Sequence, residues 1–341
     1  MSAADSPASQ GSKLPSNVRI AGTGSYLPEK ILTNAELEIL VETSDDWITS
    51  RTGIKERRIA AEGELTSHLA AKAAEKALEQ AGIEAADVEL IIVATITPDT
   101  LTPATACYVQ QHLGALKSVA FDVSAACSGF LYALELARHS VGAGAFKNAV
   151  IIGAEKLSAF VNWKDRNTCV LFGDGAGAAV LVPSENGDGR ILSSHLGTDG
   201  AQAELLNIPG GGAACPITIE NADQNLAVLS MQGREVFKHA VNAMRRASEQ
   251  AIESAGLTAA DISLVIPHQA NIRIIDAVVE RIDIDPKDVF INVDKYGNTS
   301  AAAVAIALDE ANRQGRINSG DKILLVAFGA GLTWASAVIE W

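Results

Sequence analysis

Apolar residues along the chain form short continuous runs that alternate with segments of helical spacing. Residues 88–95 and 323–328 are almost wholly apolar, as central strands covered on both faces are. Residues 67–81 and 232–255 instead repeat apolar residues every three or four positions. The first of these segments ends at Gly82, a residue suited to a left-handed helix cap. The alternation predicts an α/β protein.

The chain also repeats itself once. Residues 73–94 and 247–268 align at a fixed offset with about half of their positions identical, and residues 121–123 match 291–293 at a slightly shorter offset. A single repeat of this length predicts two copies of one α/β unit, each a sheet covered by helices, packed about a pseudo-two-fold axis. We therefore expect three parts: a flexible tail (1–17), an N-terminal half (18–184) and a C-terminal half (185–341).

Composition narrows the classes of function. The net charge of −14 argues against nucleic-acid binding, which needs clustered Lys and Arg. The longest apolar runs are too short to span a bilayer, and the polar residues 1–17 contain no signal-peptide core. The four cysteines show neither CxxC nor zinc spacing, so we expect free thiols in a reducing compartment, no metal site and a cytoplasmic protein.

The segment Phe121-Asp-Val-Ser-Ala-Ala-Cys-Ser-Gly-Phe130 carries the first candidate for chemistry. Residues 121–123 are interpreted as the end of a buried strand, and residues 129–139 as a helix. Cys127 would then lie at the helix N-terminus, where amide groups and the helix dipole stabilise a thiolate and lower the cysteine pKa. The alternative is that Cys127 is a small buried hydrophobe.

Two polar residues of the second copy could complete a site with Cys127. His268 ends a predicted strand at 262–266, where ligands bind in open α/β folds, although a core histidine is the alternative. Asn298 follows residues 291–293, a strand predicted by the repeat, and so occupies almost the position that Cys127 has in the first copy. An Asn next to Gly is usually a turn residue, but the pseudo-symmetry brings Asn298 towards Cys127.

Two glycine-rich segments also follow or precede strands. Phe328-Gly-Ala-Gly331 has small residues that let backbone amides approach a ligand, as one half of an oxyanion hole with the Cys127 amide as the other. The alternative is a tight turn. Phe172-Gly-Asp-Gly-Ala-Gly-Ala178 fits a dinucleotide pattern, but a strand and not a helix is predicted after it, so we reject phosphate binding there.

Together these segments resemble the thiolase superfamily and, within it, the β-ketoacyl-acyl-carrier-protein synthase III family. The resemblance spans residues 18–341 and rests on these stretches: Gly22-Thr-Gly-Ser-Tyr-Leu-Pro28, Ser44-Asp-Asp-Trp-Ile48, Arg51-Thr-Gly-Ile54, the Cys127 segment, Phe172-Gly-Asp-Gly-Ala-Gly177, Pro267-His-Gln-Ala-Asn271, Gly297-Asn-Thr-Ser300 and the Phe328 turn. It implies a thiolase-like fold of αβαβα layers. It also implies a homodimeric acyltransferase that condenses an acyl-CoA primer with malonyl-acyl carrier protein, using no cofactor beyond the coenzyme A thioester substrate.

The resemblance implies roles for individual residues. Cys127 matches the nucleophile that accepts the acyl group, and His268 and Asn298 match the pair that hydrogen-bonds the malonyl thioester oxygen while CO₂ leaves. The amides of Cys127 and Ala330 match the oxyanion hole. Contacts to coenzyme A are implied for Thr43, Trp47, Arg51, Arg166, Asn271 and Arg273, with Trp47 and Arg166 on the two faces of the adenine.

Two positions, Ala330 and Thr102, depart from the family pattern. Ala330 replaces a glycine of many relatives, but its amide is retained. Thr102 stands near the acyl tunnel and dimer interface, where acetyl-specific relatives have a large aromatic residue. Its small side chain predicts that the enzyme tolerates primers longer than acetyl.

An acidic carrier protein needs a local basic patch on this acidic chain. The candidates are Arg234, Lys238, Arg245, Arg246 and Arg273.

Other classes of protein share some of these residues. A Cys, His and Asn in this order also occur in papain-like proteases, but their local cysteine signature is absent here. Thiolases carry a second cysteine near the C-terminal glycine turn, and this chain has none beyond Cys215. Chain-elongating synthases use two histidines and a lysine where this chain has His268 and Asn298. A non-catalytic synthase subunit would lack the nucleophile. Condensing enzymes of secondary-metabolite or long-chain hydrocarbon pathways, which use longer primers, share the same motifs and remain an alternative.

Overall fold

The computed structural model describes residues 17–185 and 188–341, so most of the predicted tail lies outside the described residues. The first half of the chain forms a five-stranded sheet in the order β1-β7-β6-β4-β5. Its strands are β1 (Val18–Tyr26), β4 (Leu90–Ala94), β5 (Val119–Val123), β6 (Ala149–Glu155) and β7 (Gly175–Pro183). The interior strand β4 is parallel to both β5 and β6, and all five of its residues are buried.

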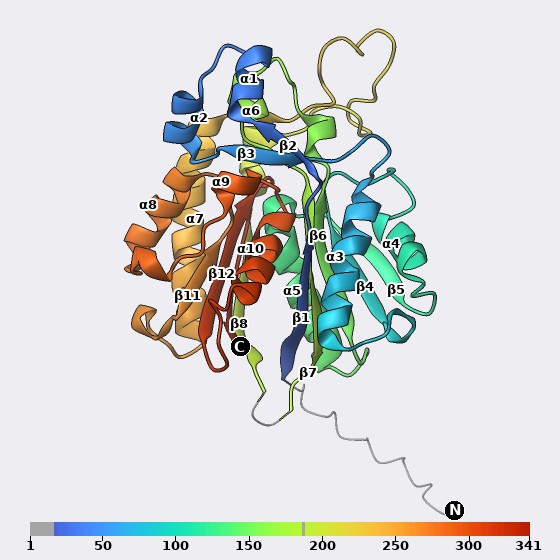
Figure 1. Cartoon of the computed structure of the whole chain (residues 1–341), viewed down its shortest axis with the longest axis vertical. Coiled ribbons are helices and arrows are strands. Elements are labelled where there is room, and N and C mark those ends of the chain that lie inside the picture. The colour runs from blue at the N-terminus through green and yellow to red at the C-terminus, as the bar shows by residue number, and fades with distance from the viewer. Residues whose placement is uncertain (1–16, 186–187) are drawn as a thin grey trace, which may run out of the picture.

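The second half forms a four-stranded sheet in the order β11-β12-β13-β8 (Figure 1). Its strands are β8 (Arg190–Thr198), β11 (Leu264–Pro267), β12 (Lys322–Gly329) and β13 (Thr333–Glu340). Strands β11 and β12 are parallel, as are β4 and β6 in the first sheet. The repeat in the sequence therefore appears as two related sheets.

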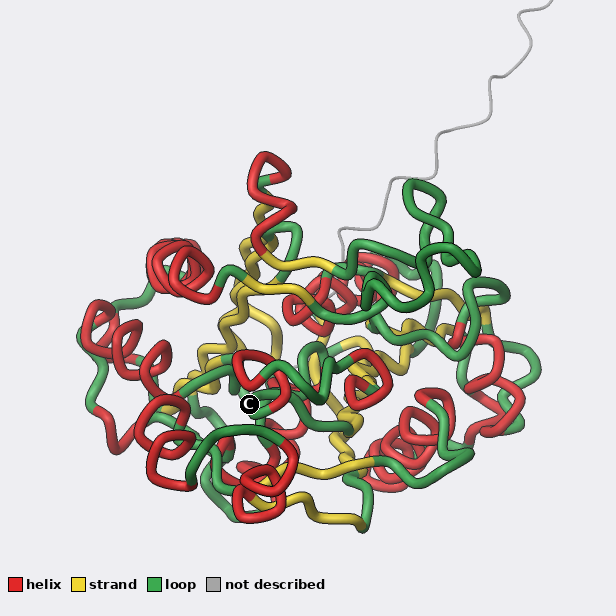
Figure 2. The backbone as a smooth tube through the Cα atoms, turned by 90° about the horizontal axis from the view of Figure 1, so that it is seen from above, coloured by secondary structure: helices red, strands yellow, loops and turns green. Residues whose placement is uncertain are grey.

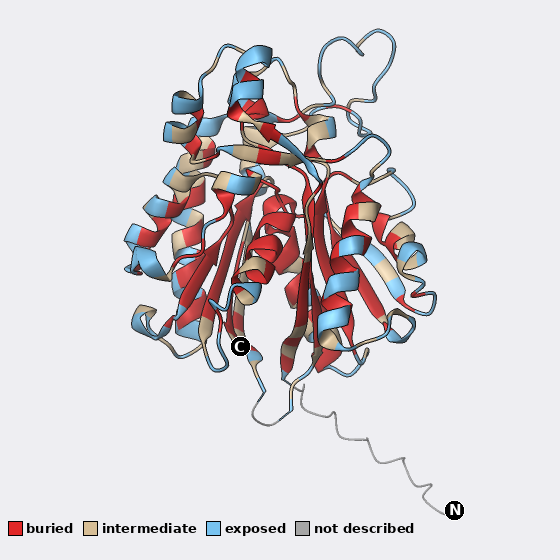
Figure 3. Cartoon of the chain, viewed as in Figure 1, coloured by how far each residue is buried: buried red, intermediate tan, exposed pale blue. Residues whose placement is uncertain are grey.

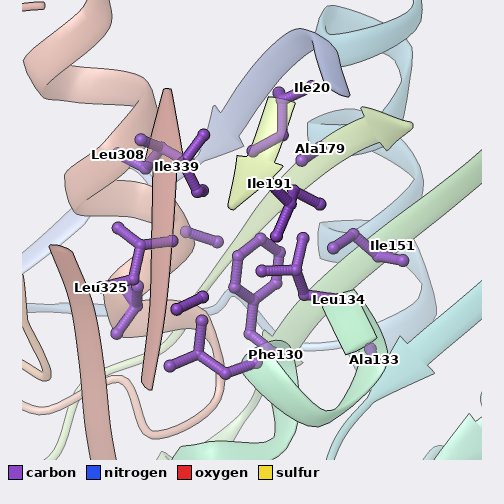
Figure 4. Packing of buried hydrophobic residues seen from close by; sticks show 14 of the residues in the cluster. Ile20, Phe130, Ala133, Leu134, Ile151, Ala179, Ile191, Leu308, Leu325 and Ile339 are labelled. Carbon is purple, nitrogen blue, oxygen red and sulfur yellow. The ribbon is translucent and has the colours of Figure 1, made fainter. Parts of the chain in front are cut away.

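Helices form three layers around the two sheets, which gives the αβαβα arrangement. The central layer contains α5 (Gly129–Gly142) and α10 (Ala302–Arg313), whose apolar residues share one core with residues of both sheets. Figure 4 shows part of this core, in which Phe130 and Leu134 of α5 meet Leu325 of β12 and Ile151 of β6. The predicted arrangement of αβαβα layers is confirmed.

The outer layers each cover the other face of one sheet. On the first sheet lie α3 (Thr66–Ala81) and α4 (Thr105–Leu113), and on the second lie α7 (Gly233–Ser254) and α8 (Ile272–Ile282). Seen from above, helices lie around the strands and also between them (Figure 2), and most of the strands, together with α10, are buried while the outer helices turn exposed faces to solvent (Figure 3). Helix α3 ends at Gly82, which has a φ of +66° as predicted for its cap. No helix in the described part of the chain is long and apolar enough to span a bilayer.

A cap of short elements covers one end of the two sheets, at the top of Figure 1. It contains β2 (Lys30–Thr33), α1 (Asn34–Leu40), α2 (Asp45–Thr52), β3 (Glu56–Ile59), η3 (Leu157–Phe160) and α6 (Arg166–Cys169). Arg57 holds the cap together from inside: its guanidinium donates to the carbonyls of Leu32 and Val170 and to Asn34 Oδ1. Burial lowers the pKa of Arg57 to about 10, so the side chain stays charged at neutral pH.

Two sequence-based expectations about strands are wrong. Strand β5 is not buried: it is the edge of its sheet, and Phe121 is 38% exposed. Residues 291–293 form no strand. The chain makes only a bridge between Val289 and Val265 and then enters α9 (Val293–Tyr296). The reason is that the side-chain oxygen of Gln269 accepts the amides of Asn292 and Val293, which removes them from sheet pairing.

Candidate active site

A cavity of about 940 Å³ opens where the carboxyl ends of the strands from both halves meet. Cys127, His268 and Asn298 all line it, together with Ser300 and the turn at Gly329 and Ala330. The first residue comes from the N-terminal half and the other two from the C-terminal half. The fold thus brings together the three residues that the sequence singled out.

Cys127 lies in a single 3₁₀ turn, η2 (Ala126–Ser128), directly before α5 begins at Gly129. Ala126 has a φ of +46°, a left-handed conformation that is costly for a residue with a Cβ. Gly329 packs against this turn so closely that a Cβ there would lie 2.6 Å from the Cys127 nitrogen. The strained turn and the glycine together hold the Cys127 backbone against the Phe328 turn.

The prediction that the helix N-terminus lowers the pKa of the Cys127 thiol is wrong in the free protein. The side chain is only 8% exposed, and burial raises the pKa of the Cys127 thiol to about 12. A hydrogen bond between Cys127 and Ser300 lowers that pKa and the nearby carboxyl of Glu155 raises it further, both by less than burial. Desolvation of a thiolate therefore outweighs the helix N-terminus at this position. The free protein holds Cys127 as a thiol at neutral pH.

His268 follows β11 directly and is pinned there by its own backbone, whose amide donates to the carbonyl of Val326. The ring is 3% exposed, and burial lowers the pKa of His268 to about 4, so the imidazole is neutral at physiological pH. Its buried Nδ1 has no hydrogen-bond partner among the described residues. An unpaired lone pair costs less than an unpaired N–H, so this favours the tautomer with the proton on Nε2.

Asn298 is held by its neighbours on three sides. Its backbone amide donates to Leu171 and its carbonyl accepts the amide of Gly173, which inserts the Phe172 glycine motif beside it. The side-chain oxygen accepts the backbone amide of Ser300 at 2.8 Å. Since that amide can only donate, the oxygen must face it, and Nδ2 is left to donate elsewhere. The motif Phe172–Ala178 therefore positions Asn298. It leads into a strand and not a helix, as predicted, although β7 already begins at Gly175.

Three further residues at the site were not assigned roles from the sequence. Ser300 touches Cys127, and Glu155 lies behind both of them at the end of β6. Gln269 fixes the chain between β11 and α9 by donating to the carbonyls of Pro267 and Phe290. A signal for Glu155 was present, because a carboxylate that closes an otherwise apolar strand run points to the ligand-binding edge of the sheet.

The residues expected to contact coenzyme A gather at the cap side of the cavity. Trp47, Arg51, Asn271 and Arg273 line it. The Arg166 guanidinium carbon lies 5.1 Å from the centre of the Trp47 ring, close enough for a cation–π contact. Arg166, which contacts Trp47, does not itself line the cavity, nor does Thr43, and Thr102 is exposed on the loop after β4, away from the cavity lining. The structure thus groups the expected coenzyme A residues but leaves Thr102 apart.

The cavity lining has a charge opposite to that of the whole chain. It contains four basic side chains and none from Asp or Glu. The basic residues are Arg51, Arg234, Lys238 and Arg273. Arg245 and Arg246 lie further along α7 and do not line the cavity, and Arg245 is already paired with Glu249 at 2.7 Å. The entrance therefore attracts anions, while the two more distant arginines of the expected patch lie outside it.

Comparisons with known proteins agree over nearly the whole chain. Residues 121–200 match the family model "3-Oxoacyl-[acyl-carrier-protein (ACP)] synthase III" and residues 252–341 match its C-terminal model. The chain is 58% identical over 94% of its length to a β-ketoacyl-[acyl-carrier-protein] synthase III of Caldanaerobacter subterraneus, covering 97% of that protein. It is 52% identical to the one of Clostridioides difficile, with coverage of 94% and 98%. It is also similar to the crystal structure of the Aquifex aeolicus synthase III, at 48% identity, a TM-score of 0.88, and coverage of 95% and 100%.

Proposed function

The chain belongs to the 3-oxoacyl-[acyl-carrier-protein] synthase III family, and we propose that Cys127, His268 and Asn298 perform the family's reaction in it. The enzyme is an acyltransferase. It joins an acyl-CoA primer to malonyl-acyl carrier protein by decarboxylative Claisen condensation, releases coenzyme A and CO₂, and thereby initiates fatty-acid synthesis. All four cysteines are free, which suits action in the reducing cytoplasm.

Formation of an acyl-cysteine is the first step. The Cys127 sulfur attacks the thioester carbonyl of acyl-CoA, and the coenzyme A thiolate leaves. The amides of Cys127 and Ala330 stabilise the oxyanion. What supports this is the close packing of Gly329 against the Cys127 backbone, because it keeps the two amide-bearing segments side by side.

Loss of CO₂ is the second step. The bond between the carboxylate and the methylene carbon of the malonyl group breaks, and its electron pair becomes an enolate. Nε2 of His268 and Nδ2 of Asn298 donate to the enolate oxygen, and the carbon then attacks the acyl-cysteine carbonyl. Two preorganised neutral donors in a dry site stabilise a negative charge far better than water does. Neutral His268 and the orientation of Asn298 are the observations that support this step.

The observation that carries the proposal is the convergence of the three residues, from both halves of the chain, on one cavity. Intact-protein mass spectrometry tests it directly. After incubation with acyl-CoA, the protein gains the mass of one acyl group on Cys127 and loses it again when malonyl-acyl carrier protein is added. Absence of an adduct, or an adduct at another residue, contradicts the proposal.

The basic entrance predicts how the carrier protein docks. We expect Arg273→Glu to raise KM for malonyl-acyl carrier protein about tenfold or more, because a like charge repels the acidic carrier protein. KM for acyl-CoA should rise as well, since Arg273 is also expected to contact coenzyme A. Lys238→Glu is expected to act in the same direction, although Lys238 is already paired with Glu235 at 2.8 Å. Steady-state kinetics with each substrate varied in turn measures both constants.

Arg281→Glu is the matched control for this experiment. Arg281 lies on α8 as Arg273 does, but it bonds the carbonyl of Ala277 and does not line the cavity. Its charge reversal should leave KM for the carrier protein near the wild-type value. Equal effects of the two reversals, or none from Arg273→Glu, contradict a docking patch at the entrance.

The edge strand β5 supports a homodimer. Its backbone is unpaired on the outer side, and the large apolar residues Leu101, Leu116, Val119 and Phe121 are exposed on this strand and the loops beside it. Such an edge is usually covered by a partner. We expect Phe121→Asp to convert a dimer into a monomer, as measured by sedimentation velocity. A wild-type protein that is monomeric at micromolar concentration contradicts this interface.

Primer length depends on Thr102, which shares the exposed loop with Leu101 and can reach an acyl tunnel only in an assembly. Its small side chain is expected to let the enzyme use C6–C10 acyl-CoAs in competition with acetyl-CoA. Thr102→Phe should shift the preference towards acetyl-CoA on the order of tenfold, since steric exclusion of a few methylenes has effects of this size. Strict preference of the wild-type enzyme for acetyl-CoA contradicts the prediction.

A further inference from the structure

Behind the nucleophile lies a carboxyl group that the two steps above do not use. Glu155 ends β6 and its side chain has no exposed surface. One oxygen, Oε2, accepts the hydroxyls of Thr97 at 2.6 Å and Thr95 at 3.2 Å. The backbone amide of Ile96 donates to both carboxyl oxygens. A buried carboxyl group with so many donors is held in one orientation.

Ser300 connects this carboxyl group to the cysteine. Its hydroxyl donates to Oε1 of Glu155 at 3.0 Å, and the same side chain hydrogen-bonds Cys127. The approach of the loop depends on Gly153: a Cβ there would lie far too close to the carbonyl group of Ala301, the residue after Ser300. Ser300 itself has a φ of +48°, which is strained for a residue with a side chain. The strained backbone of Ser300 therefore places its hydroxyl between the thiol of Cys127 and the carboxyl group of Glu155.

Few other titratable groups surround Glu155. Cys127 faces it from η2. Lys156, the next residue, directs its ammonium to backbone carbonyls at positions 61 and 64. Asp174, at the start of β7, directs its carboxyl group to Ser158 and to the amide of residue 60. In the part of the chain that the structure describes, the hydrogen-bond partners of Glu155 are the hydroxyls and the amide given above, and of these only Ser300 connects it to Cys127.

We propose that Glu155 and Ser300 form a proton relay for Cys127. As the sulfur attacks the acyl-CoA carbonyl, the thiol proton passes to Ser300 Oγ while the Ser300 proton passes to Glu155. The sulfur keeps the electron pair that forms the new C–S bond, and coenzyme A leaves as a thiolate that takes a proton from water. Glu155 holds its proton while the acyl-cysteine exists. When the enolate displaces Cys127, the proton returns through Ser300 to the sulfur. The inference rests on the proposed function of Cys127.

The acidities of the two ends suit such a relay. Burial raises the pKa of Glu155 to about 7, so the carboxyl group can accept and return a proton near neutral pH. The pKa of Cys127, about 12 in the free protein, means that the thiol does not ionise unaided. Because only ionised Glu155 can accept the proton, acylation should become faster as the pH rises through about 7. His268, with a pKa of about 4, does not titrate in this range.

The test is the pH dependence of single-turnover acylation by acyl-CoA, and of alkylation by iodoacetamide, in Glu155→Gln. A relay predicts acylation slower by about 10²-fold at pH 7.5 and loss of the rise through pH 7. A carboxylate that merely repels the thiolate predicts the opposite, because its removal lowers the thiol pKa and speeds both reactions. Unchanged or faster acylation in Glu155→Gln overturns the proposal.

Two further variants complete the experiment. Ser300→Ala keeps Glu155 but breaks the path, and it should reproduce the slow, pH-independent acylation. It decides the question by the same criteria if Glu155→Gln does not fold. Asp309→Asn removes another buried carboxylate that accepts two hydroxyls, those of Thr23 and Ser25, and it should keep the wild-type pH profile. A wild-type protein that is not acylated at Cys127 would instead refute the proposed function.

Discussion

Cys127→Ser folds but forms no acyl-enzyme, and its rate of condensation falls by about 10⁴–10⁶-fold, the size of loss seen when a covalent nucleophile is removed. Serine is nearly the same size as cysteine, so the cavity and the 3₁₀ turn should persist. Its hydroxyl is far less acidic than a thiol whose pKa is already raised to about 12 by burial. The measurements are intact mass after incubation with acyl-CoA and the rate of product formation with both substrates.

Cys169→Ser is the control for Cys127→Ser. Cys169 is also fully buried, and burial raises the pKa of its thiol to about 11, but it packs in the cap core and does not line the cavity. This variant should be acylated and should turn over near the wild-type rate. Turnover by Cys127→Ser within tenfold of wild type would show that the sulfur is not the nucleophile.

His268→Ala slows decarboxylation of malonyl-acyl carrier protein by about 10²–10³-fold, because it removes one of the two donors to the enolate oxygen. Asn298→Ala should have an effect of similar size. The double variant should lose less than the product of the two, since a single remaining donor supports the charge poorly. Release of CO₂ from malonyl-acyl carrier protein in the Cys127→Ser background measures this step apart from acyl transfer.

The pH profile separates donation by a neutral ring from donation by a cation. With a pKa of about 4, His268 is neutral from about pH 5 upward, so decarboxylation should not vary with pH between about 5.5 and 8. An imidazolium donor with an ordinary pKa would lose activity as the pH rises through about 6.5. His195→Ala, on β8 and outside the cavity lining, is a control that should leave the rate unchanged. A fall in rate above pH 6.5 contradicts a neutral donor.

Much of the architecture could be predicted because it depends on local patterns. The apolar run at β4, the helical spacing of α3 and α7 and the glycine cap at Gly82 each encode one element and its buried face. The repeat then fixed the number of sheets. It misled at residues 291–293, because the side chain of Gln269 takes the amides that a strand would have used. A pattern of apolar residues does not reveal a hydrogen bond from another segment.

For the candidate site, the sequence predicted which residues are involved but not their protonation states. Position at the end of a strand was enough to single out Cys127 and His268 as candidates, because the ends of parallel strands meet at one edge of a sheet. The repeat singled out Asn298, although no strand forms at residues 291–293, and the family resemblance supplied the roles of all three. Their protonation states could not be predicted. The pKa of Cys127 depends on how completely residues from both halves exclude water, and the same desolvation lowers the pKa of His268.

The sequence by itself therefore determined most of the elements, their duplication and the candidate reactive groups, since each of these is encoded within short stretches of chain. Only the tertiary structure decided that β5 is an exposed edge, that the cavity entrance is basic in an acidic protein, and that Glu155 reaches Cys127 through Ser300. These properties depend on distances between residues far apart in the chain and on the water that those residues displace. No single segment of the sequence encodes these distances or the exclusion of water.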